Sequence, residues 1–355
     1  MRPAGQFTST AADMGKLARF LMGDGRIDDK PFIASELLQA MGRPHGTEAA
    51  KVGLQVGFGL GLATRDRHGA IGKCHGGSTV GYRAMFCLFP QQQKAFFIAM
   101  NADSETANYG LLDALLVTAL SLTPPVTEPA PDQAFDPAGW EGYYIPSPNR
   151  FASLVWLDTV LNFARLRAVG AGLRFTPFQS PAVELTHVGG ALFRANGRAS
   201  ASHVLLTANS GERGIGTGSQ SYEKVSLLKL VPLWGSLLIG LLGLAAILIS
   251  GVIRMATRRI SASHPMLVPF AGVVAVLLPL PLFFQQSFLQ LGELTLASGS
   301  LAAATAMLPV TMLVGIALGM REWRRNWLDL AAMFGVLQLT VVLAAWHLLP
   351  FRLWA

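Results

Sequence analysis

Four long apolar stretches fill the C-terminal part of the chain. No Asp, Glu, Lys or Arg occurs in residues 230–253, 266–284, 294–320 or 330–346. Each stretch approaches or exceeds the roughly 17 to 25 residues that a helix needs to cross the hydrocarbon of a bilayer. Four such stretches in succession would leave a soluble core with almost nothing to cover it. We therefore predict an all-α, four-helix transmembrane bundle over residues 226–355, with spans at about 230–253, 266–284, 296–320 and 328–349.

The N-terminal part combines helical and strand patterns. Thr10 and Asp13 form a capping-box-like motif before apolar residues at helical spacing, which predicts a helix over about residues 11–22. Alternating or glycine-rich runs predict strands over residues 56–63, 70–75, 83–89 and 95–101. A second helix is predicted over residues 105–120. This order of elements predicts an α+β domain over residues 1–122.

A proline-rich segment separates this domain from a third pattern. Residues 123–138 predict a linker and a domain boundary. Beyond them, short runs predict strands over residues 139–144, 153–163, 173–177, 182–188, 191–194 and 203–208. We predict a small antiparallel β domain, either a sheet or a barrel, over residues 139–225.

Composition and charge support a membrane protein. Of the 355 residues, 51% are hydrophobic and 14% are charged, whereas soluble domains carry about a quarter charged residues. The net charge of +7 does not indicate a nucleic-acid partner, because much of the excess flanks the apolar stretches, in Arg254, Arg258, Arg259, Arg321, Arg324 and Arg325. The positive-inside rule places these loops in the cytoplasm. We predict a multi-pass protein of the plasma (inner) membrane, partnered by the lipid bilayer, with its soluble domains on the outer or periplasmic side.

The two cysteines, Cys74 and Cys87, are too few for a disulfide framework or a usual metal site. Both lie on strands that we expect to pair through a turn at residues 78–82. If residues 77 and 83 are opposed, Cys74 faces residue 86 and the two sulfurs point to opposite faces of the sheet. We therefore expect buried free thiols, with a disulfide as the alternative.

Isolated polar residues and glycines yield little further chemistry. The glycine run at residues 57–61 lacks the spacing of a dinucleotide-binding loop, and His187 and His203 are expected to be surface or core residues. Neither a cofactor nor a metal is expected. In the apolar stretches, Gly315 and Gly319 are expected to pack within the bundle, and His347 is expected at the membrane interface.

Three blocks in the N-terminal domain support a family resemblance over about residues 2–122. The blocks read PAGQFTSTAADMGKLARFLM, GFGLGLA and HGGSTVGYRAMFCLFPQQQKAFFIAMNAD. In this order they resemble the last part of the serine β-lactamase and penicillin-binding-protein-like hydrolases, closest to the class C and esterase branch. The resemblance implies that a lipocalin-like β domain follows the hydrolase head.

The same resemblance implies a catalytic site on the glycine-rich strand. The family's Lys-Thr-Gly or His-x-Gly element corresponds to His75-Gly76-Gly77. His75 is expected to orient the substrate or transfer a proton, and Gly77 to admit the acyl group closely. The backbone N–H of Ser78 is expected to be an oxyanion donor. The implied catalytic residues are therefore His75, Gly77 and Ser78.

The nucleophile that this family uses is absent from the chain. No Tyr-x-Asn occurs, and the SxxK at Ser226–Lys229 follows the glycine-rich strand instead of preceding it. Residues after Met1 also contain no signal peptide. We expect these elements to lie upstream of Met1 or on a separate chain.

The sequence leaves three functions to compare. The first is a membrane-anchored serine hydrolase that cleaves an ester, amide or D-amino-acid peptide through an acyl-enzyme and is inactive without its missing nucleophile. The second is a non-catalytic membrane protein whose hydrolase-like ectodomain binds a ligand or partner. A channel or transporter is the least supported, because no span carries a mid-bilayer carboxylate or lysine.

Overall fold

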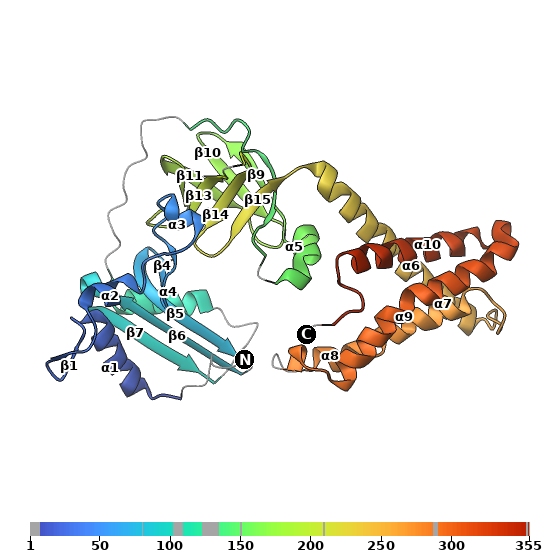
Figure 1. Ribbon diagram of the computed structural model, residues 1–355, viewed down its shortest axis with the longest axis horizontal. Coiled ribbons are helices and arrows are strands. Elements are labelled where there is room, and N and C mark those ends of the chain that lie inside the picture. The colour runs from blue at the N-terminus through green and yellow to red at the C-terminus, as the bar shows by residue number, and fades with distance from the viewer. Residues whose placement is uncertain are drawn as a thin grey trace. The chain divides into compact units, whose positions relative to one another are not determined.

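The structure is a computed structural model that describes residues 8–79, 81–101, 109–122, 135–149, 151–208, 210–286, 290–352 and 354. The chain separates into two units, and most of their helices and strands are labelled in Figure 1. The first unit comprises the residues up to Pro148 together with Leu161–Val225, and the second comprises Asn149–Val160 and Ser226–Ala355. The first holds an open sheet and a closed barrel, and the second holds the long apolar helices.

A five-stranded antiparallel sheet in the order β3-β4-β5-β6-β7 forms the N-terminal part of the first unit. Its strands are β3 (Gly57–Phe58), β4 (Ala63–Arg67), β5 (Ala70–Thr79), β6 (Tyr82–Phe89) and β7 (Lys94–Met100). The helices of this part are α1 (Ala11–Met22), α2 (Ser35–Ala40), α3 (Glu48–Lys51) and α4 (Tyr109–Ala119). A small hairpin of β1 (Arg26–Ile27) and β2 (Lys30–Pro31) and a 3-10 turn, η1 (Pro90–Gln92), complete it.

Helices cover both faces of this sheet. Successive side chains of a strand point to opposite faces, because a strand has a side-chain period of two. Phe86 and Leu88 are buried in a cluster with Ala18 of α1, whereas Phe89 is buried in a cluster with Val117 of α4. The alternation of apolar residues along β6 therefore builds two small cores, one on each side of the sheet.

Most of the helices and strands predicted for this part are observed. The predicted helix over residues 11–22 is confirmed, and Thr10 Oγ1 caps it by accepting the N–H of Asp13 at 3.1 Å. The second predicted helix is observed as α4, while residues 105–108 lie outside the described residues. The single strand predicted over residues 56–63 is wrong, because the chain turns between β3 and β4. Gly61 has a φ of +86°, and a Cβ at Gly59 would lie 2.3 Å from the carbonyl oxygen of Met41.

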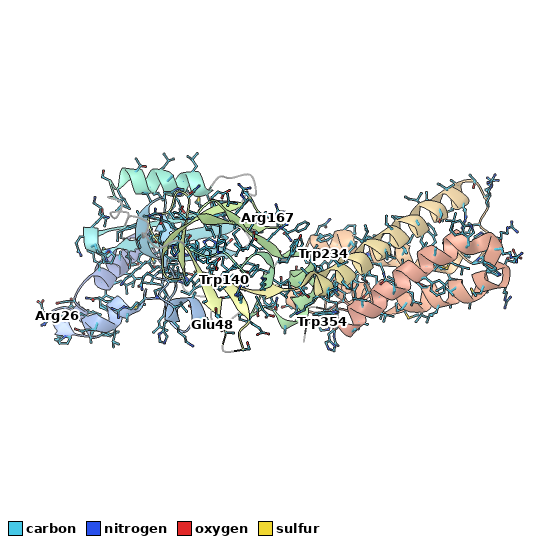
Figure 2. All side chains as sticks on the ribbon, turned by 90° about the horizontal axis from the view of Figure 1, so that it is seen from above. Arg26, Glu48, Trp140, Arg167, Trp234 and Trp354 are labelled. Atoms are coloured by element: carbon cyan, nitrogen blue, oxygen red, sulfur yellow. A yellow bond between two sulfur atoms is a disulfide. The ribbon has the colours of Figure 1, made fainter. Side chains whose placement is uncertain are left out.

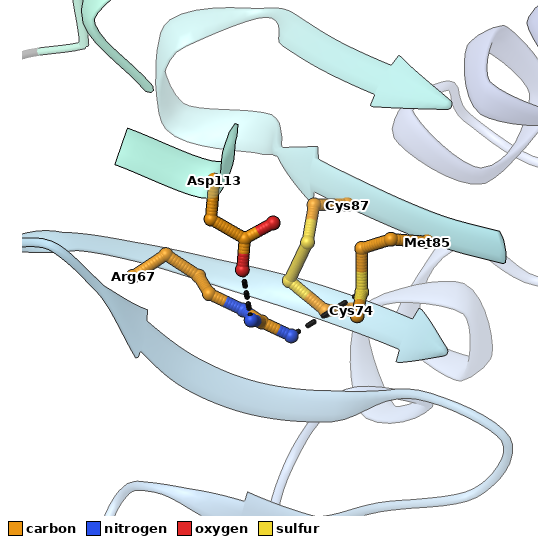
Figure 3. Close-up of a disulfide and its surroundings, with 5 residues drawn as sticks. All are labelled: Arg67, Cys74, Met85, Cys87 and Asp113. Carbon is orange, nitrogen blue, oxygen red and sulfur yellow. Dashed lines mark hydrogen bonds and ion pairs between the residues drawn. A yellow bond between two sulfur atoms is a disulfide. The ribbon is translucent and has the colours of Figure 1, made fainter. Parts of the chain in front are cut away.

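The cysteines form a disulfide, so the expectation of free thiols is wrong. In the register of β5 and β6, Gly77 faces Ala84 and Cys74 faces Cys87, one residue away from the expected pairing. Directly opposed cysteines lie on the same face of a sheet, and the Cα atoms of this pair are 4.1 Å apart. Figure 3 shows the bond crossing between the two strands. A one-residue difference in register therefore decides the state of both sulfurs.

A closed eight-stranded antiparallel barrel, in the order β10-β11-β12-β13-β14-β15-β8-β9, forms the rest of the first unit. Its strands are β8 (Gly142–Pro146), β9 (Ala164–Val169), β10 (Gly172–Pro177), β11 (Val183–Gly189), β12 (Leu192–Ala195), β13 (His203–Thr207), β14 (Arg213–Thr217) and β15 (Ser221–Val225). The buried cluster includes Tyr144, Leu166, Phe175, Phe193 and Ile215. The predicted small antiparallel β domain is confirmed as this barrel, which large side chains fill.

The strand predicted over residues 153–163 is wrong, because this segment is helical. It forms η2 (Ala152–Leu154) and α5 (Val155–Leu161). Trp156 and Val160, four residues apart, are both buried, which is the spacing of one helix face. Thr159 Oγ1 donates to the carbonyl oxygen of Val155 at 2.8 Å, so its hydroxyl is satisfied within the helix. The β-branched residues of this segment are accommodated in the helix.

The second unit consists of long apolar helices. They are α6 (Leu227–Ala256), α7 (Leu267–Leu277), α8 (Leu280–Phe284), α9 (Leu296–Gly319) and α10 (Trp323–Ala345), with 3-10 turns η3 (Gln290–Gly292) and η4 (Met320–Glu322). Three described segments are long and apolar enough to cross a membrane: Leu227–Ala256, Leu267–Phe284 and Leu296–Ala345. The helical region is thus as predicted, but the number of four spans is not confirmed, because α9, η4 and α10 run together as one segment of 50 residues.

Close helix packing in this unit depends on glycine. A Cβ at Gly243 of α6 would lie 2.5 Å from the carbonyl oxygen of Ala332 in α10, and one at Gly315 of α9 would lie 2.2 Å from Pro269. The expectation that Gly315 and Gly319 pack within the bundle is consistent with these contacts. Because lipid provides no hydrophobic drive between apolar helices, small residues that allow backbone approach supply much of the packing.

Polar side chains also join helices of the second unit. Gln338 donates to the carbonyl oxygen of Ser236 at 2.8 Å and accepts the Ser236 hydroxyl at 2.7 Å. The Arg254 guanidinium makes two bonds to the Asp329 carboxylate, at 2.7 and 3.0 Å. Trp234, labelled in Figure 2, donates its indole N–H to the carbonyl oxygen of Val160, which joins α5 to α6. These polar groups are explained by helix pairing.

We expect thiol titration to find no free thiol in the denatured, unreduced protein and two after reduction. The reason is that Cys74 and Cys87 are bonded to each other. A variant with both cysteines replaced by serine provides the background control. Two reactive thiols before reduction would contradict the observed register.

A Gly243→Ala substitution is expected to lower the thermal stability of the protein in detergent. The added methyl meets backbone, and overpacking of this kind costs about 1–3 kcal/mol. Gly235→Ala in the same helix is the matched control, because no atom lies within 4 Å of its Cβ. The control should unfold at the same or a higher temperature, since alanine favours a helix by about 1 kcal/mol over glycine. Equal melting temperatures for the two variants would contradict the packing described.

Candidate functional site

The residues implied as catalytic lie on β5 but do not converge. His75, Gly77 and Ser78 are all exposed. Side chains alternate along a strand, so His75 points to the face covered by α1 and Ser78 to the face covered by α4. His75 Nδ1 is 2.7 Å from the carbonyl oxygen of Gly61, and among the described residues no serine hydroxyl is hydrogen-bonded to this histidine. The side chains of His75 and Ser78 therefore do not form a nucleophile–base pair.

The same residues form an open strand edge. Residues Ala70–Cys74 of β5 pair with β4, whereas from His75 to Thr79 the strand pairs with β6 and, within the described residues, has no strand on its other side. A Cα separation of 4.1 Å is typical of a non-hydrogen-bonded pair, so the N–H and C=O groups of Cys74 point toward β4. By the two-residue period, the N–H and C=O groups of Gly76 and Ser78 point to the open side. We call residues His75–Thr79 the open edge.

Little side-chain bulk surrounds the open edge. A Cβ added at Gly77 would have no atom within 4 Å, and one at Gly76 would meet the flexible end of Met85. Exposed strand edges pair readily with other extended chains, and proteins usually cover or charge them. Here the edge is accessible and its glycines permit close backbone approach.

A cavity of about 660 Å³ lies between the sheet and the barrel, within the first unit. Strands β3 and β4 and helix α4 form one wall, and residues at the rim of the barrel form the other. Its charged lining residues are Arg65, Asp66, Arg67, Asp113 and Arg198. Sequence reasoning did not identify these residues, because they come from segments up to 133 positions apart and match no motif.

Asp66 joins the two walls of this cavity. It is a buried residue of β4 whose carboxylate accepts the N–H of Gly69 at 3.0 Å and those of Ala199 and Ser200 at 2.6 and 3.3 Å. Arg198 Nη1 also donates to the carbonyl oxygen of Asp66 at 2.6 Å. A carboxylate that accepts several backbone N–H bonds is well satisfied when buried. Asp66 therefore attaches a barrel loop to the sheet.

Arg67 and Asp113 form a second polar contact in the cavity wall. The Arg67 guanidinium is hydrogen-bonded to the Asp113 carboxylate of α4, and its Nη2 is 3.2 Å from the sulfur of Met85 (Figure 3). Both charged side chains are mostly buried, with 16% and 15% exposure. This pair holds α4 against β4, so Asp113 is neutralised by Arg67.

His203 is the buried polar residue of the barrel rim. It is 8% exposed, its ring contacts Phe175, and its Nδ1 is 2.9 Å from the Ser202 hydroxyl. Burial, together with the smaller effect of the nearby Arg198 charge, lowers its pKa to about 4. Of the two locations expected for His203, surface or core, the structure shows the core. His187 instead contacts Phe135 and Phe193 and is bonded to the carbonyl oxygen of Gly190.

No group of three or more His, Cys, Asp or Glu side chains placed to hold a metal occurs among the described residues.

The His203 environment predicts acid-sensitive stability. In the unfolded chain histidine has a pKa near 6.5, so between about pH 4 and 6.5 the unfolded chain binds more protons than the folded one. The free energy of unfolding should therefore fall as the pH falls through this range, by about 2 kcal/mol between about pH 7.5 and 4.5 from this group. Urea unfolding in detergent at both pH values measures it. His203→Gln should reduce the pH dependence by this amount, and an unchanged dependence would contradict it.

Comparisons with known proteins identify no family. No family model and no curated protein matches the chain. Similar solved structures are described as "Crystal structure of SurE", with 18% identity and a TM-score of 0.35, and "Crystal structure of SurE with D-Leu", with 21% identity and a TM-score of 0.37. Each match covers 61% of this chain and 48% or 50% of the other, so the chain spans about half the length of those structures.

These comparisons contradict the expected β-lactamase and penicillin-binding-protein family. The structures found are of SurE, and no model of the expected family matches. The physical reason is that the glycines in the matching blocks serve the packing of this chain. A Cβ at Gly57 would lie 3.1 Å from the carbonyl oxygen of Gly218, and one at Gly59 would meet Met41. Short glycine-rich blocks of this kind follow from close backbone contacts and do not by themselves indicate a reaction.

Proposed function

We propose that this chain is a membrane-anchored binding protein that captures an extended peptide segment by strand addition at the open edge. The observation that carries the proposal is the accessible backbone of residues His75–Thr79, which pairs with β6 on one side only within the described residues. A peptide added beside β5 would gain main-chain hydrogen bonds from Gly76 and Ser78. The glycines leave room for its backbone. His75 provides a ring that can donate or accept a hydrogen bond beside it.

The apolar helices support the anchoring role. Their outward side chains include large apolar residues with high exposure, such as Leu228 at 87%, Leu296 at 83% and Phe284 at 77%. Surfaces of this kind are stable in lipid and prone to aggregation in water. Three segments are long enough to cross a bilayer.

We also propose that the helices of the second unit cross the bilayer four times. A straight helix of 50 residues would be about 75 Å long, more than twice the roughly 30 Å of bilayer hydrocarbon. Two crossings, α9 and α10, joined at η4 fit the bilayer better, and the two helices contact each other. An even number of crossings places the first unit and the C-terminus on the same side.

The outer side of the plasma membrane is the proposed location of the first unit. Arginines follow α6 and lie at η4, and the positive-inside rule assigns both positions to the cytoplasm. The disulfide between Cys74 and Cys87 supports the same assignment, because disulfides persist in oxidising compartments.

We propose peptide binding without hydrolysis. The His75 and Ser78 side chains occupy opposite faces of the sheet, and a serine needs an adjacent base to act as a nucleophile. A fluorophosphonate probe should therefore leave the full chain unlabelled, and stoichiometric labelling would indicate a catalytic function instead.

The proposal predicts that peptide binding depends on the edge amides. The probe is a fluorescein-labelled decapeptide of alternating Val and Thr, measured by fluorescence anisotropy with the full chain in nanodiscs. Ser78→Pro removes an N–H that faces the open side, where proline is tolerated, and should weaken binding at least tenfold. Ser78→Ala keeps the N–H and should bind as the wild type does.

Two controls make this test decisive. The same peptide with alternate amides N-methylated cannot complete the ladder and should not bind. Thermal melts establish that Ser78→Pro remains folded. The proposal fails if the methylated peptide binds equally well, if Ser78→Pro binds normally, or if the unmodified peptide does not bind.

A further inference from the structure

The cavity between the sheet and the barrel has a surplus of positive charge. Three of its charged lining residues are arginines and two are aspartates. Asp66 is bonded to three backbone N–H groups, and Asp113 is bonded to Arg67. Both carboxylates are therefore already engaged, which leaves the charges of Arg65 and Arg198 without a carboxylate partner among the described residues.

Arg65 is a partly buried cation without a carboxylate counter-charge among the described residues. Its guanidinium lies 5.6 Å from the centre of the Phe58 ring, and no ion pair joins it to a described carboxylate. Partial burial lowers its pKa, the neighbouring Arg67 lowers it further, and Asp113 offsets part of this effect. A desolvated guanidinium without a counter-charge is unfavourable, and an oxyanion is the ligand whose geometry it matches.

A buried donor strengthens the same conclusion. Arg67 Nε is buried and has no hydrogen-bond acceptor among the described residues. Buried polar groups are nearly always satisfied, so such a donor indicates an absent acceptor. Arg65 and Arg67 lie two positions apart on β4, both at the cavity wall.

The rest of the lining is apolar or neutral. Phe58, Val56 and Val183 provide apolar surface, and Ser202 and Thr217 provide hydroxyl groups. A volume of about 660 Å³ is within the range of roughly 300–1,000 Å³ found for small-molecule sites. The cavity thus combines cationic donors with an apolar wall.

We propose that this cavity binds an amphiphilic carboxylate, a small molecule whose carboxylate is held by Arg65 and whose apolar body packs against Phe58 and Val183. The site is independent of the open edge, since the two share no residue. A ligand here would contact both the sheet and the barrel and would bind the first unit as a whole. Occupancy would therefore stabilise the contact between them.

The test measures the binding of three probes to the full chain in nanodiscs by isothermal titration calorimetry. 2-Naphthoate carries both the carboxylate and an apolar body, 2-naphthamide has the same shape without the charge, and inorganic phosphate has the charge without the body. We expect saturable binding of naphthoate, with at least tenfold weaker binding of the amide and of phosphate. Equal binding of naphthoate and naphthamide would overturn the role of the guanidinium, and stronger binding of phosphate would overturn the carboxylate assignment.

Matched arginine variants locate the site. Arg65→Gln should weaken naphthoate binding at least tenfold. Arg167→Gln is the control, because Arg167 is an exposed residue of β9 outside the cavity (Figure 2). It should bind as the wild type does. Thermal melts check that both variants fold. Equal losses in the two variants, or no saturable binding by the wild type, would refute the proposal.

Discussion

One buried carboxylate, that of Asp66, ties the sheet of the first unit to a loop of its barrel. Asp66 is the fourth residue of β4, and its oxygens accept N–H groups from a barrel loop more than 130 positions later in the chain. Burying a carboxylate costs several kcal/mol unless its oxygens accept hydrogen bonds. The Asp66 carboxylate therefore needs the N–H groups of the loop, and those N–H groups need the carboxylate as their acceptor. Removing the carboxylate would leave two barrel amides unpaired at the same point.

This attachment is one of two contacts that make the sheet and the barrel one unit, although their sequences differ strongly in pattern. The sheet is covered by helices on both faces, and the barrel is filled by its own side chains. The two parts also share a small apolar core, in which Ala49 and Leu54 pack against Val204 and Leu206 of the barrel. Beside Asp66 their contact is polar and leaves a cavity lined by Arg65 and Arg198, which have no carboxylate partner among the described residues. The surface that joins the two folds thus also carries the cationic and apolar groups that line the cavity.

The second unit is stabilised by different interactions. Its outward residues are large and apolar, and its inner contacts use glycine, a Ser236–Gln338 pair and the Arg254–Asp329 ion pair. In a bilayer, packing and hydrogen bonding between helices replace the hydrophobic effect as the source of association. Polar residues in the apolar stretches, such as Gln338, are therefore used here to join helices.

The sequence by itself determined the features that follow from local patterns, and only the tertiary structure decided what depends on register and on distant contacts. Uncharged stretches predicted the apolar helices, and Thr10 and Asp13 predicted the start of α1, because the periods of 3.6 and 2 are visible among neighbouring residues. The same patterns failed at residues 153–163, where tertiary packing buries one face of a helix. A shift of one residue between β5 and β6 makes the disulfide, and Arg198 joins Arg65 and Arg67 in the cavity lining only because the barrel loop reaches the sheet. Register and long-range contacts arise from the packing of whole elements, so no local pattern contains them.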